Sequence, residues 1–410
     1  MIQMERRVVV TGIGVVASNG IGKGAFKHAI EQGKMGIKTL PVADEVSPFK
    51  VGGYIDDFVP EHYLERKLVQ RTDRMTHLAL AAAQEAVYDA NLSMAQEDPT
   101  RVGAVIANTL GGATFATKQV RQLHLHGPRA MSAFTAVAWI QVANVGQAAL
   151  RYGFQGYCKV PVNDLAGGLD GLGTAYRAIR RGAADILIAG GCEAPLDTFV
   201  LFSQGLSGWL IATDDPTAYR PFDRHARGFL PAEGAGLCIL EDYEHARKRG
   251  ANIYGEIIGY GQSNDATGWR KLPENGRQYA RAIQQVMHEG KISLDEIGYF
   301  SLDGRALPIA DRAEVDALQH TFGTQAEHIP VSVPRTMQGH SYAAAGAIDT
   351  IGALLALQDG FIPPTLHCTY PIYNLNLVRN EARSLHGNVV ILGARSYGGS
   401  NVVLAIRKIT

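Results

Sequence analysis

The chain has 410 residues, 46% of them hydrophobic and 19% charged, which is enough for one large or two fused α/β domains with a buried core. Lys plus Arg and Asp plus Glu are equal at 39 each, so no global field favours nucleic acid or an anionic membrane. The four cysteines form no CxxC pair, which argues against a disulfide framework or a metal site and indicates a reducing compartment. There is no secretory signal, and the longest apolar run near the C-terminus, 343–357, is too short to span a bilayer, so we expect a soluble cytoplasmic protein.

Short runs rich in Val and Ile alternate with helical patterns along the whole chain. Such alternation predicts an α/β protein with a mixed or parallel sheet covered by helices. In chain order, the predicted strands lie in 6–16, 101–109, 185–191, 236–243, 254–261, 296–304, 388–399 and 401–409.

A strand that turns into a helix is predicted for residues 157–174, which comprise "YCKVPVNDLAGGLDGLG" and the threonine that follows it. Asn163 and Asp164 are residue types that cap helix N-termini, and we expect the helix to begin there. The N–H groups at such a corner stabilise an anion, so an enzyme would place a nucleophile at this point. The residue present is Leu165, which has no nucleophilic group.

The best boundary in the chain is the charged stretch 242–252, which divides it into halves at 1–250 and 251–410. The halves share a motif: 166–173 read AGGLDGLG and 345–352 read AGAIDTIG. Small residues at this period let two helices pack closely. We therefore expect two similar α/β halves whose equivalent helices meet near a central axis.

A dinucleotide-binding loop is a weak alternative for the "VTGIGVVAS" stretch at 10–18. Its glycines are followed by "VVASNG" instead of a helix, and no acidic residue ends a second strand at the expected distance. Histidines in "HLHG" at 124–127 lack further ligands at metal spacing. We expect no cofactor and no metal ion of the chain's own.

Five ordered segments of the sequence resemble the thiolase-fold condensing enzymes of the β-ketoacyl-acyl-carrier-protein synthase type. They begin with "RRVVVTGIGVV" and include "YRPFDRHARGFLPAEGAGLCILED" at 219–242 and "MQGHSYAAAGAIDTIGALLAL" at 337–357. The resemblance implies a layered α-β-α-β-α core. Within this superfamily, the segments 127–153, 166–172, 212–223 and 333–340 resemble the chain-length factor, the ketosynthase-like β subunit of type II polyketide synthases.

The resemblance also places the catalytic positions of condensing enzymes on this chain. The nucleophilic Cys position falls on Leu165, and the first catalytic His position falls on Asp303, which could instead neutralise Arg305 or Arg335. The second His is retained as His340. Because the groups of such a site act as a unit, we expect no chain elongation by this chain alone.

The implied role is that of a partner subunit which shapes an acyl tunnel and sets chain length. Its partners would be a catalytic ketosynthase α subunit, as a heterodimer, and an acyl carrier protein that holds substrates on phosphopantetheine. The strand before the corner would pair antiparallel with its counterpart in the partner. By position, the tunnel residues would be Ala113, Ala116, Val120, Val137 and Phe199.

The small side chains among these positions leave room along the tunnel wall, so we expect a product at least as long as an octaketide, or a rigid polyene. Two alternatives remain open. One is a divergent β-ketoacyl synthase-like enzyme, such as a malonyl-carrier decarboxylase that works through His340. The other is a stand-alone protein that binds carrier protein or an acyl ligand.

Overall fold

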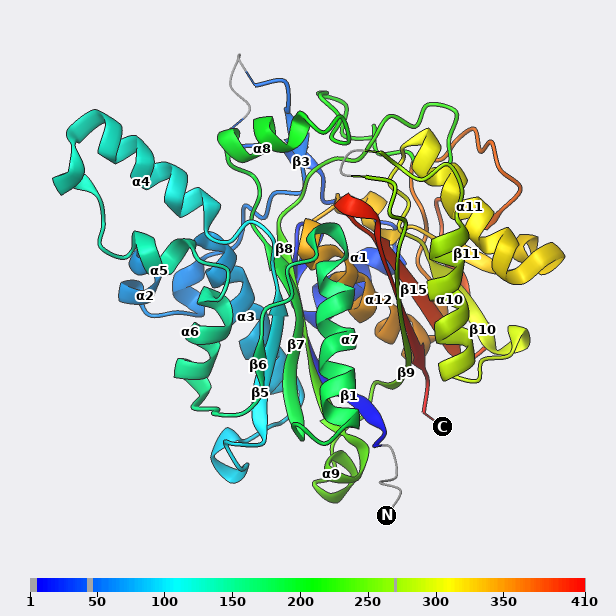
Figure 1. The fold of residues 1–410 in the computed structure, drawn as a ribbon, viewed down its shortest axis with the longest axis horizontal. Coiled ribbons are helices and arrows are strands. Elements are labelled where there is room, and N and C mark those ends of the chain that lie inside the picture. Colours follow the sequence, from blue (N-terminus) through cyan, green and yellow to red (C-terminus); the bar gives the residue numbers. More distant parts are fainter. Residues whose placement is uncertain (1–5, 43–46, 269–270, 410) are drawn as a thin grey trace.

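A computed structural model describes residues 6–42, 47–268 and 271–409 of the chain, and a large mixed β-sheet runs through this part (Figure 1). All eight predicted strands are confirmed. Their bounds are β1 Val8–Ala17, β5 Val102–Ala107, β7 Ile186–Glu193, β8 Gly234–Asp242, β9 Gly255–Asn264, β10 Ile297–Ser301, β15 Val389–Arg395 and β16 Ser400–Arg407. Shorter strands complete this sheet: β2 Gly20–Ile21, β6 Cys158–Lys159, β11 Pro330–Ser332 and β13 Asn376–Leu377.

The sheet contains the same strand order twice. The first half runs β6-β5-β7-β8-β1, and the second runs β11-β10-β15-β16-β9 with β13 at its outer edge. In both halves the outer strand pairs are parallel and the inner pairs are antiparallel. The halves join through the antiparallel pair β1–β9, in which Val8 faces Ile257. The two similar α/β halves expected from the sequence are confirmed.

Helices cover the sheet in layers. The main helices are α1 Lys23–Glu31, α3 Arg74–Asp89, α4 Ala113–His126, α6 Ala143–Tyr152, α7 Gly167–Arg180, α10 Arg277–Glu289, α11 Pro308–Phe322 and α12 Ala345–Asp359. Shorter ones are α2 Arg66–Arg71, α5 Thr135–Trp139, α8 Thr198–Gly205 and α9 Tyr243–Lys248. Helix α3 packs on β1, β7 and β8, whereas α10 packs on β9 and β16. Helices α7 and α12 lie between the two halves of the sheet, which confirms the α-β-α-β-α layering (Figure 1).

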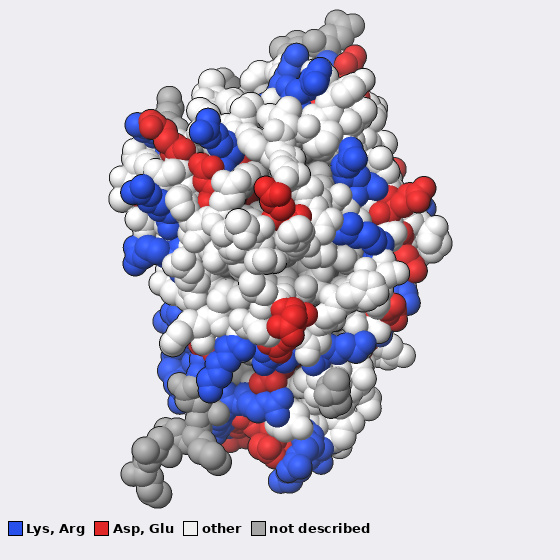
Figure 2. Space-filling view, turned by 90° about the vertical axis from the view of Figure 1, so that its right-hand side faces the viewer, with Lys and Arg blue, Asp and Glu red and all other residues white. Residues whose placement is uncertain are grey.

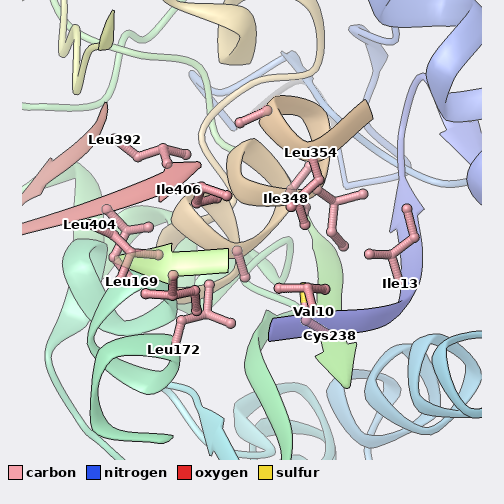
Figure 3. Close-up of a cluster of buried hydrophobic side chains, with 14 of the residues drawn as sticks. Val10, Ile13, Leu169, Leu172, Cys238, Ile348, Leu354, Leu392, Leu404 and Ile406 are labelled. Atoms are coloured by element: carbon pink, nitrogen blue, oxygen red, sulfur yellow. The ribbon is translucent and has the colours of Figure 1, made fainter. Parts of the chain in front are cut away.

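Glycines allow the two central helices to approach closely. A Cβ atom added to Gly168 would lie 2.6 Å from the carbonyl oxygen of Ala343 and 2.7 Å from the backbone nitrogen of Ala347. One added to Gly346 would lie 2.7 Å from Leu169. The two copies of the repeated motif therefore meet at the centre of the molecule. Leu169, Leu172, Ile348 and Leu354 pack there against strands of both halves (Figure 3).

The corner before α7 differs from the sequence prediction in two respects. The strand is short, because only Cys158 and Lys159 pair with β5, at the outer edge of the sheet. The helix is not capped by Asn163 or Asp164, since a 3-10 turn (η4, Asp164–Ala166) comes first and neither α7 nor η4 has a side-chain cap. The Asn163 amide instead donates to Asp170, 3.1 Å away, and Asp164 adopts a left-handed conformation with φ of 42°.

Candidate functional site

Leu165 occupies the corner between β6 and α7 and has no solvent exposure. Its side chain belongs to a buried apolar cluster that includes Trp209, Phe229 and Tyr342. The corner thus retains the turn and the following helix, but a hydrocarbon side chain occupies the position where a nucleophile would stand. No covalent chemistry can start from this residue.

Asp303, just beyond β10, is fully buried and forms ion pairs with three arginines. Its carboxylate lies 2.8 Å from Arg305 Nε, 3.1 Å from Arg335 Nη1 and 3.3 Å from Arg395 Nε. Burial alone would raise the pKa of Asp303, but the three guanidinium groups hold it well below its usual range. Asp303 is therefore ionised in the folded protein.

Two further buried carboxylates complete the ion-pair cluster. Asp349, on α12, accepts a hydrogen bond of 2.7 Å from Arg335 Nε. Glu314, on α11, lies 3.2 Å from Arg395 Nη2 and accepts hydrogen bonds from the backbone N–H groups of Asp303 and Gly304. Three arginines therefore face three carboxylates away from water, which is how buried charges are compensated.

His340 lies beside this cluster and is also fully buried. Arg335 Nη1 is 3.0 Å from its Nε2, and the backbone nitrogen of Tyr342 is 3.1 Å from its Nδ1. Burial, and then the charge of Arg335, lower the pKa of His340 well below its usual value. Both neighbours are hydrogen-bond donors, so a protonated imidazolium would have no acceptor at either nitrogen. His340 is held as a neutral ring.

The three positions therefore come together in space, but their chemistry is not that of a condensing site. Decarboxylative condensation needs a nucleophile and hydrogen-bond donors aimed at a developing enolate. Leu165 supplies no nucleophile, Asp303 carries a negative charge, and the ring nitrogens of His340 face other donors. None of the three side chains supplies a nucleophile, and the arrangement compensates buried charges within the fold.

A pocket of about 580 Å³ lies next to the corner that precedes α7. It is lined by residues of the corner, of α8 and its following turn, and of the loop between β15 and β16. Val162 and Leu206 form part of its apolar lining, and Asp164, Ser203 and Ser396 form part of its polar lining.

The proposed tunnel residues lie on three helices at one end of the molecule. Ala113, Ala116 and Val120 occupy one side of α4, and Ala116 is buried whereas Val120 is 58% exposed. Val137 on α5 and Phe199 on α8 are also exposed. Helix α4 contacts both α5 and α8, so the structure brings the three elements together (Figure 1).

Most of the exposed large apolar side chains lie on α4, α5, α6 and α8 or on segments next to these helices. We call this surface the apolar face; it comprises Val120, Leu123, Leu125, Phe134, Val137, Trp139, Ile140, Val142, Leu150, Val162, Phe199, Phe202 and Leu206. Val162 of this face follows β6, whose outer edge is unpaired in the sheet. Exposed apolar surface of this extent marks an interaction site, and an unpaired edge strand is a place where another chain can add.

The opposite side of the molecule is different in character. Figure 2 views it from the side of α10 and α11, where Lys and Arg alternate with Asp and Glu without an extended field of one sign. Within the described ranges, no group of His, Cys, Asp and Glu side chains could hold a metal ion. The four cysteines are free thiols, and none of the helices that the structure describes is long and apolar enough to cross a membrane.

Two family models match the chain in succession. The N-terminal domain of β-ketoacyl synthases matches residues 5–246, and the C-terminal domain matches residues 254–369. The chain therefore belongs to the β-ketoacyl synthase family. Within this family, its resemblance to the ketosynthase-like β subunits of type II polyketide synthases is confirmed.

Curated relatives cover almost the whole chain. It is 37% identical to the tetracenomycin polyketide synthase ketoacyl synthase beta subunit of Streptomyces glaucescens, with 98% of both chains covered. It is also 34% identical to 3-oxoacyl-[acyl-carrier-protein] synthase 2 of Staphylococcus aureus, with 98% of this chain and 99% of the relative covered.

Solved structures agree with these relatives. A type II polyketide synthase acyl-carrier protein in complex with its ketosynthase bound to the hexaketide contains a chain that matches with a TM-score of 0.91 and 30% identity. The ishigamide ketosynthase/chain length factor matches with a TM-score of 0.91 and 27% identity. In both comparisons, 99% of this chain and all of the other chain are covered.

Sequence reasoning missed several members of the site. Arg395, Glu314 and Trp209 were not singled out, although all three lie at or beside the ion-pair cluster. A signal was available for Asp349, because a lone carboxylate in the apolar helix 343–357 requires a buried partner. Its partner, Arg335, lies fourteen residues away in the sequence.

Proposed function

We propose that this chain is the non-catalytic partner of a catalytic ketosynthase α subunit in type II polyketide biosynthesis. In this role it completes and shapes the acyl tunnel and so sets the length of the product. The observation that carries the proposal is the burial of Leu165 in an apolar cluster and of Asp303 in an ion pair with Arg335. The resemblance places a nucleophile and a catalytic histidine at the positions of Leu165 and Asp303.

A second observation supports a partner. The apolar face would be poorly tolerated in water, and it lies at the end of the molecule where β6 has a free edge. A ketosynthase of the same fold offers a matching edge strand and an apolar surface of its own. The substrates would reach the pair on the phosphopantetheine of an acyl carrier protein, and this chain would need no cofactor.

The tunnel assignment rests on α4. Its residues Ala113 and Ala116 have small side chains at the base of the apolar face, and Val120 lies on the same side of the helix. Small side chains in the wall leave volume for a longer chain, on the order of several methylene groups for each missing aromatic ring. A product at least as long as an octaketide, or a rigid polyene, fits this wall.

Reconstitution tests the subunit role directly. The chain and a catalytic ketosynthase from the same gene cluster are co-expressed, with an affinity tag on only one of them, and are supplied with malonyl-carrier protein. We expect the two chains to co-purify in a one-to-one ratio. We expect polyketide to form only when both chains are present. Elongation by this chain alone, or full-length product from the ketosynthase alone, would contradict it.

The decarboxylase alternative is tested in the same experiment. Release of CO2 from malonyl-carrier protein by the isolated chain, abolished by His340→Asn, would support it. The buried, neutral state of His340 and the donors at both of its nitrogens argue against this outcome.

A further inference from the structure

Trp209 separates two spaces near the corner. On one side is the pocket of about 580 Å³, whose lining includes Trp209 and Tyr397. On the other side is a cavity of about 10 Å³, lined in part by Trp209, Arg305 and Gly399. A cavity of that volume holds about one water molecule. The indole ring is thus the wall between a wide space and one that protein atoms nearly fill.

The indole ring is held on both of its faces. The Tyr397 ring stacks on it, with ring centroids 3.8 Å apart and planes inclined by 7°. The guanidinium carbon of Arg305 lies 4.6 Å from the indole centroid. Because Tyr397 covers one face at van der Waals distance, the guanidinium occupies the other. Stacking and cation–π contacts both stabilise the ring in this position.

Each end of this stack is anchored beside the corner. Arg305 is fixed by its hydrogen bond of 2.8 Å to Asp303, which the other two arginines of the cluster hold in turn. At the other end, the backbone nitrogen of Tyr397 lies 3.4 Å from the carboxylate of Asp164, the residue before Leu165. Leu165 packs in the same apolar cluster as Trp209 and Tyr397, and it lines neither of the two spaces. The stack is therefore anchored at both ends and covers Leu165.

We propose that Arg305, Trp209 and Tyr397 form a plug that closes off the buried corner at Leu165 from the pocket of about 580 Å³. Two features then prevent thioester chemistry at the corner. It has no thiol, and no extended chain can reach it past the stack. This inference goes beyond the proposed subunit role and stands whether or not the chain pairs with a ketosynthase.

The test places a reporter thiol at the corner. Leu165→Cys is made in a Cys158→Ser background, which removes the exposed native thiol. The folded protein is treated with iodoacetamide, and mass spectrometry of the corner peptide follows the reaction. The thiolate attacks the methylene carbon, a C–S bond forms, iodide leaves and the thiol proton passes to buffer. The same protein in concentrated urea gives the rate for an accessible thiol.

Opening the plug should expose the thiol. We expect Leu165→Cys alone to be labelled at least tenfold more slowly than Leu165→Cys with Trp209→Ala. The Trp209→Phe version keeps an aromatic ring in the stack and should stay slow. Phe322→Ala, which opens a cavity in the separate cluster around α11, should also stay slow and controls for general loosening.

A second variant covers the case in which Trp209→Ala fails to fold. Tyr397→Ala removes the partly exposed end of the stack, and it should raise the labelling rate while the urea midpoint stays close to that of the parent. If Leu165→Cys with the stack intact reacts as fast as either opened variant, the plug does not exist. This readout is independent of product formation, so it separates the plug from the subunit role.

Discussion

Asp303 and Arg335 form a fully buried ion pair, with 3.1 Å between Oδ1 and Nη1. Arg335 also contacts Asp349 and His340, so one guanidinium connects the segment after β10 to the central helix α12. The buried charges of this cluster stabilise the fold by compensating one another.

Asp303→Asn should strongly destabilise the fold. The variant leaves three buried arginines with one fewer counter-charge, and breaking a buried pair costs about 3–5 kcal/mol. Urea unfolding measures the loss. Glu244→Gln is the matched control, because its pair with Arg247 is exposed and should change the free energy of unfolding by less than about 0.5 kcal/mol. A small effect of Asp303→Asn would mean that the cluster is not held together by this charge.

Gly168→Ala should destabilise the chain by about 1–3 kcal/mol, because the new methyl group would overlap the backbone of Ala343 and Ala347. Gly146→Ala provides the comparison. Gly146 also lies in a helix, but a Cβ there meets open space, so this substitution should stabilise by about 0.5–1 kcal/mol. Opposite shifts of the two urea midpoints are expected, and equal shifts would refute close packing of α7 on α12.

His340 should make stability depend on pH below neutrality. Its folded-state pKa is lowered from an ordinary value of 6.5, so its contribution is fully present above pH 6.5 and is lost as the pH falls below that value. Between pH 7.5 and pH 5.5 the parent protein should lose about 1 kcal/mol that His340→Asn does not lose. Paired urea titrations at the two pH values measure this difference. Parallel losses in both proteins would show that His340 takes up a proton in the folded state.

Ala116→Phe should shorten the polyketide made by the reconstituted pair, because the ring would fill the space beside α4. Mass spectrometry of the products gives the chain length. Ala95→Phe, at an exposed position on the 3-10 turn Met94–Gln96, is the control and should leave the product unchanged. Unchanged length with Ala116→Phe, in a pair that still assembles, would remove α4 from the tunnel wall.

Trp139→Asp should reduce co-purification with the ketosynthase at least tenfold, because it places a charge in the apolar face. Ile309→Asp changes an equally exposed apolar side chain on α11, away from that face, and should have no effect on assembly. If both variants still bind the partner normally, the partner contacts a different surface.

Much of the fold could be predicted from the sequence, because strand periodicity and the repeated small-residue motif are local patterns. The eight long strands and the meeting of the repeated motif at the centre follow from such patterns. The local structure of the corner before α7 was harder to predict. Asn163 was expected to cap α7, but its amide bonds Asp170 one turn into that helix. Cap residues have several possible partners, and the sequence does not say which one they take.

The absence of a nucleophile and of one histidine could be predicted from the sequence, but the ion-pair cluster and the ring stack could not. Leu165 and Asp303 could be located by resemblance. Arg395 and Glu314 lie 92 and 11 residues from Asp303 in the sequence, and their contact with it or its backbone depends on how β15 and α11 pack in space. The same holds for the stack on Trp209, which joins residues from three separate loops.

The pairing of β1 with β9 has a consequence for how the molecule comes apart. Val8, Val9 and Val10 pair with β9 of the second half along one edge of β1, while β1 pairs along its other edge with β8 of the first half. Unfolding of β1 or β9 in either half would break the backbone hydrogen bonds of the β1–β9 pair. In addition, the central helices α7 and α12 share one apolar cluster. The chain should therefore unfold in a single cooperative transition, with no stage at which one half survives alone.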